Sequence, residues 1–510
     1  MKSFETMVND IKDSEKKENE IDPTLREKLV EYSSELEKIE GDYATVYEYF
    51  EPYGAGGRKF DDEFSDFLQK RKTDPDYCPV FEYPKLDEVD PEKLDKDSQA
   101  LREIRNKLEK EENEELKIVV TNALEVTESK IEMLKNIKNG DFDKAFACAK
   151  RAFGDINEEL VKIAQELYEQ KKNDTAKKRA EKENKQEEKG AEGEGEEIKK
   201  KLESVNFEAD DFQNYFEMLI KNAGFDKDGW EVIITDEVKA LDVRSSSKDY
   251  DHPVILIPRE RKKDKNGKEE KVDGVKFLKL LNHEFTHIIT QTYNRRNGYG
   301  SVTFGPDYEV FTEGIAKMAE DEIEKEALDK PEEEAEILAS PYYVLAINKA
   351  KEGANFRQVF DYLVELKKQE LESGGTGSKK AEEKAITDMK GYARRIFRGF
   401  NPKEGGKYFP KDKAYLQGEI GARKMEDEGI ADYLYESKVD PEMIPYLNKL
   451  GAYVQKEGLS AAREVVKKMW KDKNWPQDLI LNRKWYQENT QMDRHWAYRR
   501  EFQEKMDDEN

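Results

Sequence analysis

The sequence is poor in cysteine, in histidine and in long apolar runs. Its 510 residues include two cysteines, Cys78 and Cys148, and four histidines. Two cysteines cannot build a disulfide framework, so the reduced cytoplasm is the expected compartment. No stretch approaches the ~20 apolar residues that a membrane-spanning helix needs, which excludes an integral membrane protein. Residues 1–10 lack the apolar core of a signal peptide, so we expect no export.

Acidic residues outnumber basic ones, with 114 Asp and Glu against 89 Lys and Arg, for a net charge of −25. This balance argues against a general nucleic-acid binder, whose affinity comes from neutralising phosphates. We therefore expect neither nucleic acid nor a membrane as a partner. The length exceeds one compact core and predicts two to four domains or lobes.

Apolar spacing predicts a soluble, predominantly helical α+β protein. Leu25, Leu29, Tyr32 and Leu36 recur at helical intervals, and similar patterns continue to about residue 168. After residue 202 the pattern changes. An amphipathic helix is expected over 206–222, and two strands bounded by Gly, Asp or Pro are expected over 230–235 and 254–257. Most of the chain beyond residue 274 again favours helix.

One segment, 171–197, contains no Val, Ile, Leu, Met, Cys or aromatic residue. It cannot bury enough apolar area to offset the entropy of ordering, which predicts a solvated linker or a frayed helix end. An exposed continuation of the preceding helix is the alternative. The predicted regions are a helical amino-terminal region (1–170), a charged linker (171–200), a domain that carries the chemistry (201–435) and a helical tail (436–510).

The clearest chemical pattern is His-Glu-x-x-His at His283, Glu284 and His287. On a helix, residues four apart share a face, so both imidazoles can reach one ion, and zinc suits imidazole nitrogen. Asp273 is placed to cap the start of this helix. Glu284 would face the zinc-activated water, take its proton and return it to the leaving amine. The alternative is two histidines that merely share a helix face.

Two histidines leave a catalytic zinc site one protein ligand short. We favour Glu313, on a second predicted helix, with Glu309 as its rival; His252 and His495 are isolated. Glu320, two turns after Glu313, is expected to orient a ligand imidazole. Gly314 and Ala316 are small enough to let the two helices approach closely. Two His and one Glu form the ligand set of the gluzincin class of metallopeptidases.

A basic segment follows further along the chain, with eight Lys or Arg against two acidic residues over 390–413 and aromatic residues between them. It predicts a surface that holds a substrate carboxylate or an acidic tail through charge-assisted hydrogen bonds. The alternative is a solvated face with internal ion pairs. The proposed carboxylate-binding residues are Arg394, Arg395, Arg398 and Lys413. Tyr415 is a candidate for assisting the oxyanion.

Several motifs occur in a particular order along the chain, at 78–83, 283–298, 312–316, 395–399 and 411–418. Their order resembles the microtubule-associated tyrosine carboxypeptidase-like family, in a bacterial-type form. The resemblance implies a gluzincin-like zinc carboxypeptidase with His283, His287 and Glu313 as ligands and Glu284 as base. It also implies a basic groove for an acidic carboxyl-terminal tail. The eukaryotic members space their histidines five apart, whereas here they are four apart.

The expected function is therefore zinc-dependent hydrolysis of peptide bonds at the carboxyl end of a peptide or protein tail. Two alternatives remain open from the sequence. One is an endopeptidase or aminopeptidase of gluzincin type. The other is a metal-stabilised scaffold that binds peptides with little turnover. The different histidine spacing also leaves open whether the substrate ends in tyrosine.

Overall fold

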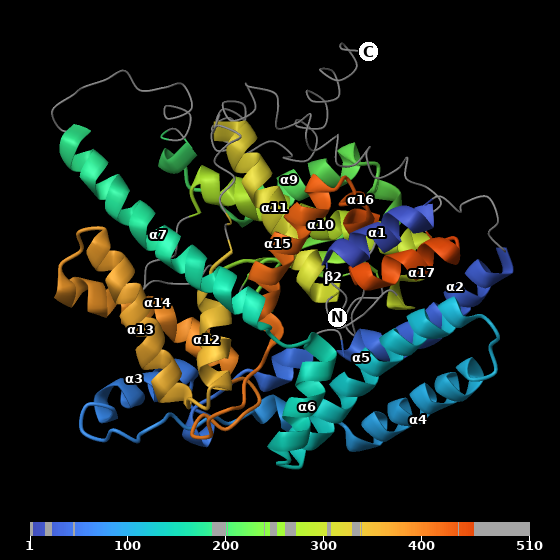
Figure 1. Cartoon of the computed structure of the whole chain (residues 1–510), viewed down its shortest axis with the longest axis horizontal. Helices are drawn as coiled ribbons and strands as arrows, with labels where there is room; N and C mark the ends of the chain where they lie inside the picture. Colours follow the sequence, from blue (N-terminus) through green and yellow to red (C-terminus); the bar gives the residue numbers. More distant parts are fainter. Residues whose placement is uncertain are drawn as a thin grey trace, which may run out of the picture.

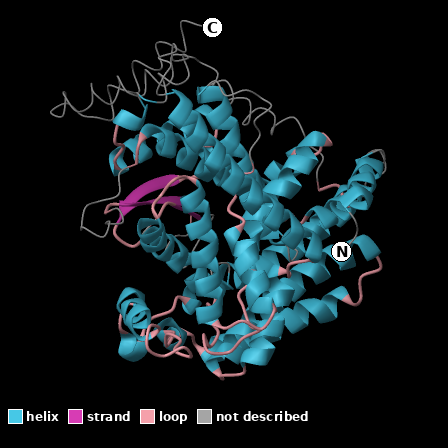
Figure 2. Cartoon of the chain, turned by 60° about the vertical axis from the view of Figure 1, so that its left-hand side comes forward, coloured by secondary structure: helices cyan, strands magenta, loops and turns pink. Residues whose placement is uncertain are grey.

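The structure, a computed structural model, is mostly helical with one small sheet (Figure 2). This confirms the predicted predominantly helical α+β class. Within the part of the chain that the structure describes, no helix combines the length and the apolar composition of a membrane span. The residues described are 4–15, 23–43, 46–185, 200, 202–238, 240–244, 252–260, 272–302, 308–328, 337, 339–436 and 438–452.

The first half of the chain is a succession of helices (Figure 1). Asp90, Asn113 and Asp141 cap α4, α5 and α6 by accepting hydrogen bonds from backbone N–H groups of the first turn. Helix α7 crosses the molecule and continues to Lys185, so the predicted linker begins as helix; residues 186–199 lie outside the described part. The helices are α1 (Phe4–Glu15), α2 (Pro23–Glu40), α3 (Phe60–Lys70), α4 (Pro91–Leu108), α5 (Glu114–Lys138), α6 (Phe142–Phe153), α7 (Glu158–Lys185) and α9 (Ala209–Asn222).

The sheet has three strands in the order β1-β3-β2. Strands β1 (Glu231–Thr235) and β3 (Val254–Pro258) run parallel and agree with the two predicted strands. Strand β2 (Asp242–Arg244) pairs antiparallel with β3 and forms an edge. The sequence did not indicate β2, because three residues that include Asp and Arg carry no period-two pattern. Its edge position brings it beside the functional site described below.

The second half returns to helices after the sheet. Short 3-10 turns also occur, at Gly41–Tyr43, Val46–Phe50, Ala55–Gly57, Pro84–Glu88, Asp226–Asp228, Gly300–Val302, Lys411–Lys413 and Pro441–Met443. Of the predicted tail, residues 453–510 lie outside the described part. The helices are α10 (Gly274–Asn297), α11 (Tyr308–Leu328), α12 (Tyr342–Lys351), α13 (Phe356–Ser373), α14 (Ser378–Ile396), α15 (Ala414–Asp427), α16 (Asp432–Glu436) and α17 (Ile444–Lys449).

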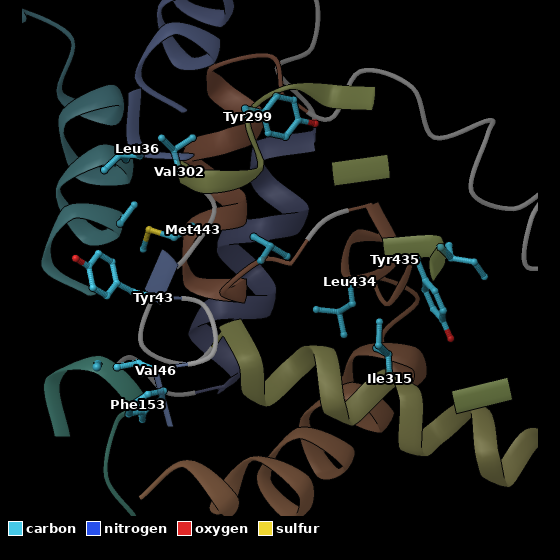
Figure 3. Packing of buried hydrophobic residues seen from close by; sticks show 14 of the residues in the cluster. Leu36, Tyr43, Val46, Phe153, Tyr299, Val302, Ile315, Leu434, Tyr435 and Met443 are labelled. Atoms are coloured by element: carbon cyan, nitrogen blue, oxygen red, sulfur yellow. The ribbon is translucent and has the colours of Figure 1, made fainter. Parts of the chain in front are cut away.

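Two hydrophobic clusters hold these elements together. The larger one joins α1, α2, α4, α5 and α6 to the sheet, α10, α16 and α17. Figure 3 shows part of it, where Leu36 of α2 lies beside Val302; Met443 belongs to the same cluster. The smaller cluster joins α3 and α7 to α12, α13 and α14. Both draw residues from either side of residue 200, so the amino-terminal helices share a core with the later ones. The four-region division remains a prediction.

Candidate metal centre and active site

Helix α10 carries the histidine motif and begins where the sequence predicts. The side chain of Asp273 accepts a hydrogen bond from the Lys276 N–H at 2.9 Å, and the helix ends at Gly298, whose φ is 75°. One face of the helix is buried against the larger cluster, through Phe277, Leu281, Phe285 and Ile288. His283 and His287 lie on another face, and their Nε2 atoms are 3.2 Å apart.

Helix α11 supplies the predicted carboxylate. Glu313 Oε2 lies 3.6 Å from His283 Nε2. One ligand atom from each of His283, His287 and Glu313 lies within 4.8 Å of the others. Elsewhere, His252 pairs with Glu231 at 2.7 Å, Glu309 pairs with Lys411 at 2.9 Å, and His495 is outside the described residues. The structure therefore brings together the three favoured ligands, whereas His252 and Glu309 are paired with other side chains.

Two of the three distances between these atoms agree with the spacing of ligands around a zinc ion. A tetrahedral zinc with bonds of 2.0–2.1 Å holds two nitrogen ligands about 3.3–3.4 Å apart. The distances of 3.2 Å between the imidazoles and 3.6 Å from imidazole to carboxylate are close to this value. A set of three protein donors without thiolate is typical of catalytic zinc sites, whereas structural sites usually use four.

Glu320 contacts the first imidazole, as the sequence predicts. Its Oε1 lies 2.7 Å from Nδ1 of His283, which leaves Nε2 to face the other two ligands. Lys317 contacts the same carboxylate oxygen at 2.5 Å and holds it in place. A carboxylate on the second ring nitrogen fixes the tautomer of a metal-binding histidine and raises its basicity. The sequence predicted this role from the seven-residue spacing of Glu313 and Glu320.

The pKa values at the centre reflect this crowding of charge. Burial lowers the pKa of His283, but hydrogen bonds with Glu313 and Glu320 outweigh it and raise the pKa to about 10. Burial and the nearby His283 lower the pKa of His287 to about 3. For Glu313, burial acts to raise the pKa, yet the imidazoles hold it well below its usual range. The carboxylates around His283 therefore favour a positive charge at this position.

Glu284 differs from the other acidic groups at the centre. Burial raises its pKa to about 7, and the negative charge of Glu313 adds to this effect. It follows His283 on α10 and faces the same cavity. A carboxylate with a pKa near neutrality is suited both to accept a proton and to return it.

A cavity of about 750 Å³ opens onto these residues. Its walls come from α2, β2, α10 and α11, together with Tyr47, Lys411, Tyr415 and Lys438. Along α10 it extends from His283 past His287 to the end of the helix. A cavity of this size accommodates a few residues of a peptide. The amino-terminal helix α2 therefore forms one wall of the site.

The predicted substrate residues occupy two different environments. Tyr415 lines the cavity, and its hydroxyl accepts a hydrogen bond from Arg395 at 3.2 Å. Burial raises its pKa, which keeps the phenol protonated. The four basic residues proposed for the carboxylate, Arg394, Arg395, Arg398 and Lys413, are not among the residues that line the cavity. Their assignment to the substrate remains a prediction.

Each of these basic residues already contacts another part of the chain. Arg394 pairs with Glu51 at 2.8 Å, and Arg398 lies 3.7 Å from the same carboxylate. Arg395 pairs with the buried Asp412 at 2.5 Å. The buried Lys413 donates to the side chain of Gln417 at 2.8 Å. The alternative interpretation, a solvated face with internal ion pairs, fits only in part, because the Arg395–Asp412 pair lies within the segment but Arg398 and Lys413 are buried and Glu51 lies outside it.

Other basic side chains line the cavity instead. Lys317 lies one helical turn after Glu313, so its spacing in the sequence could have indicated it. Lys411 belongs to the basic segment, pairs with Glu309 and lies over the ring of Tyr47. Sequence reasoning had no pattern by which to find the others, because each comes from a strand edge, a helix end or a loop. The basic lining residues are Arg244, Arg295, Lys317, Lys411 and Lys438.

Gly314 positions α11, but not in the way the sequence suggested. We expected it to let α11 approach the histidine helix. Instead, a Cβ atom on Gly314 would lie 2.1 Å from the carbonyl carbon of Gly418, so the close contact is with α15. Gly314 follows Glu313 and therefore points about 100° away from it around the helix. The side chain of Asn282 ties α10 to α11 by donating to the Ala319 carbonyl.

Comparison with known proteins agrees with this geometry. The model of one protein family, described as microtubule-associated tyrosine carboxypeptidase, matches residues 65–480. The match includes α10, α11 and the basic segment, and it covers most of the chain. A comparison with individual curated proteins finds no match. The extent of the family match shows that the chain belongs to the microtubule-associated tyrosine carboxypeptidase family.

Proposed function

We propose that the protein is a zinc-dependent carboxypeptidase that removes residues from the carboxyl end of peptide or protein tails. The family name denotes a carboxypeptidase, which supports hydrolysis of this type. The observation that carries the zinc assignment is the set of three donor atoms within 4.8 Å, from His283, His287 and Glu313, beside the buried Glu284. A purely structural metal site has no need of such a base.

Each side chain of the centre has a distinct part in this proposal. His283, His287 and Glu313 would hold the ion, and Glu320 keeps the His283 Nδ1 proton so that Nε2 can ligate. Bound zinc supplies a Lewis acid that polarises the scissile carbonyl and lowers the pKa of water. The Glu284 carboxylate accepts a proton from the attacking water and delivers it to the leaving amine. The Tyr415 hydroxyl, polarised by Arg395, donates to the developing oxyanion.

The cavity walls offer contacts for an extended peptide. Strand β2 lies at the edge of the sheet and lines the cavity, so a substrate chain can add alongside it. The basic lining groups, foremost Lys411 and Lys438, are placed to attract a terminal carboxylate or an acidic tail. The family name points to a substrate that ends in tyrosine, as on microtubules. We propose this class for the present chain as a tail with a free terminal carboxylate.

Zinc-loaded protein and a matched pair of peptides test this function. The pair has one sequence with either a free or an amidated carboxyl terminus. A carboxypeptidase releases the last residue of the free peptide and spares the amidated one. An endopeptidase or aminopeptidase cleaves both, and that result would reject the carboxypeptidase assignment. One bound zinc per chain with no cleavage of any peptide would favour the scaffold instead.

The variant Glu284→Gln tests the role of the base. It keeps the size of the side chain but cannot accept the proton, so kcat should fall by about 10²–10⁴-fold. Its zinc content should equal that of the wild type, because Glu284 is not a ligand. Equal kcat in the two proteins would reject the mechanism.

A further inference from the structure

We propose that Gln291 accepts a hydrogen bond from the peptide substrate, at a subsite one helical turn beyond His287. The inference rests on the proposed peptidase function and deepens it, because it assigns a specificity residue that the histidine motif does not include. The ligand is a hydrogen-bond donor of the peptide. That donor is either a backbone N–H or the side-chain O–H or N–H of the terminal residue.

Gln291 is buried, 3% exposed, and it belongs to the cavity wall. Its Nε2 donates to the carbonyl of Val243 in β2 at 3.0 Å. A carbonyl can only accept, so this bond fixes which end of the amide is nitrogen. The Oε1 atom is thereby held in place as an acceptor, and it has no hydrogen-bond partner among the described residues.

A second acceptor lies three residues further along the same helix face. Oδ1 of Asn294 is also buried without a partner in the described part of the chain, and Asn294 also lines the cavity. Two adjacent buried acceptors without donors are uncommon in a folded protein, because each loses its hydrogen bonds to water. A ligand that brings donors would restore these bonds. An anion would not, since an amide oxygen repels it.

The position of Gln291 relates the subsite to the scissile bond. Four residues of helix correspond to about 6 Å along the axis of α10. An extended peptide covers that distance in about two residues. A substrate whose scissile bond lies at the histidines and whose chain follows β2 therefore brings a donor from one of its last residues to Gln291.

The test compares wild type with Gln291→Met on two pairs of peptides. One pair ends in Tyr or Phe and differs by a single side-chain hydroxyl. The other pair differs by N-methylation of one backbone amide next to the scissile bond. Wild type should prefer the donor-bearing member of one pair by about 3- to 10-fold in kcat/KM. In Gln291→Met that preference should disappear, and the pair that responds identifies the donor.

Two further variants separate recognition from support of the fold. Gln291→Glu keeps acceptor oxygens but loses the N–H that holds them in place against Val243, so it should retain part of the preference that Gln291→Met loses. Gln213→Met is the matched control, because Gln213 likewise donates to a strand carbonyl, that of Val232, at 3.0 Å, but does not line the cavity. It should leave both preferences unchanged.

The inference is overturned if Gln291→Met discriminates within both pairs as wild type does. It is also overturned if Gln213→Met loses the preference as completely as Gln291→Met, since the loss of a helix-to-strand hydrogen bond would then be what matters. Binding of the same peptides to zinc-loaded Glu284→Gln, with and without Gln291→Met, should show the same change in preference without turnover. If wild-type protein hydrolyses no peptide, the proposed function fails, and this binding measurement still decides the role of Gln291.

Discussion

The helix pair α10–α11 and the basic segment 390–413 use charge in opposite ways. At the helix pair, donor atoms from three side chains converge within 4.8 Å and face a cavity. In the basic segment, Arg394, Arg395 and Arg398 each lie against a carboxylate of the protein and do not line that cavity, whereas Lys411 of the same segment does. The comparison teaches that an excess of charge does not by itself make a binding site. A binding site also requires that the charged side chains converge on an accessible space.

The largest expected effect comes from breaking the helix pair at its third ligand. Glu313→Gln removes the charged oxygen that completes the ligand set, so the protein should lose its zinc and its hydrolytic activity together. The loss of zinc affinity should exceed the about 10–100-fold change typical of removing an outer hydrogen-bond partner. Zinc content after dialysis measures it. Glu309→Gln is the control, and a variant at 313 that keeps stoichiometric zinc would contradict the ligand assignment.

The next prediction tests whether the arginines of the basic segment stabilise the fold rather than bind the substrate. Arg395→Ala leaves Asp412, which is 1% exposed, without its cation, and breaking such a buried pair costs roughly 3–5 kcal/mol. The free energy of unfolding, from denaturant titration, should fall by that amount. Arg394→Ala breaks a partly exposed pair and should cost only about 0–1 kcal/mol. If the two variants lose the same free energy of unfolding, the contrast between the buried pair and the partly exposed pair is wrong.

A smaller effect is expected at Glu320, which touches the metal only through His283. Glu320→Gln keeps a hydrogen-bond acceptor but loses the charge, so zinc affinity should fall by about 10–100-fold. Competition with a chelator of known affinity measures this change. Activity at saturating zinc should largely return, which distinguishes Glu320 from a direct ligand. Failure of excess zinc to restore activity would assign it a different role.

The smallest pair of effects compares one glycine from each region. Gly314→Ala places a methyl group against the backbone of Gly418 and should destabilise the fold by about 1–3 kcal/mol. Gly391, within α14 of the basic segment, has no atom within 4 Å of an added Cβ. Gly391→Ala should therefore stabilise the protein by roughly 0.5–1 kcal/mol. Thermal unfolding measures both changes, and the same sign for both would contradict the packing described here.

The sequence predicted the metal centre better than the substrate side, for a physical reason. The positions of His283, Glu284 and His287 are related by helical geometry alone, and the same holds for Glu313 and Glu320 on α11. The spacing of residues within each helix was therefore enough to predict which side chains share a face at the metal centre. Joining the two helices required one further step, from the shortage of a third ligand.

The substrate side depends on contacts between distant parts of the chain. Glu51 meets Arg394, and Lys438 and strand β2 reach the cavity, through tertiary packing that no local pattern encodes. The same holds for α2, which was predicted as part of a separate amino-terminal region and forms one wall of the cavity. Gly314 illustrates the same difficulty for a single residue. The sequence indicated that its small size permits a close helix contact, but it did not indicate that the neighbouring helix is α15.

The most direct test of the central claim is a crystal structure of the protein grown with zinc. The account predicts one ion within about 2.0–2.2 Å of His283 Nε2, His287 Nε2 and a Glu313 oxygen, with Glu320 still on His283 Nδ1. An ion bound elsewhere, or a Glu313 side chain turned away from the two imidazoles, would contradict it.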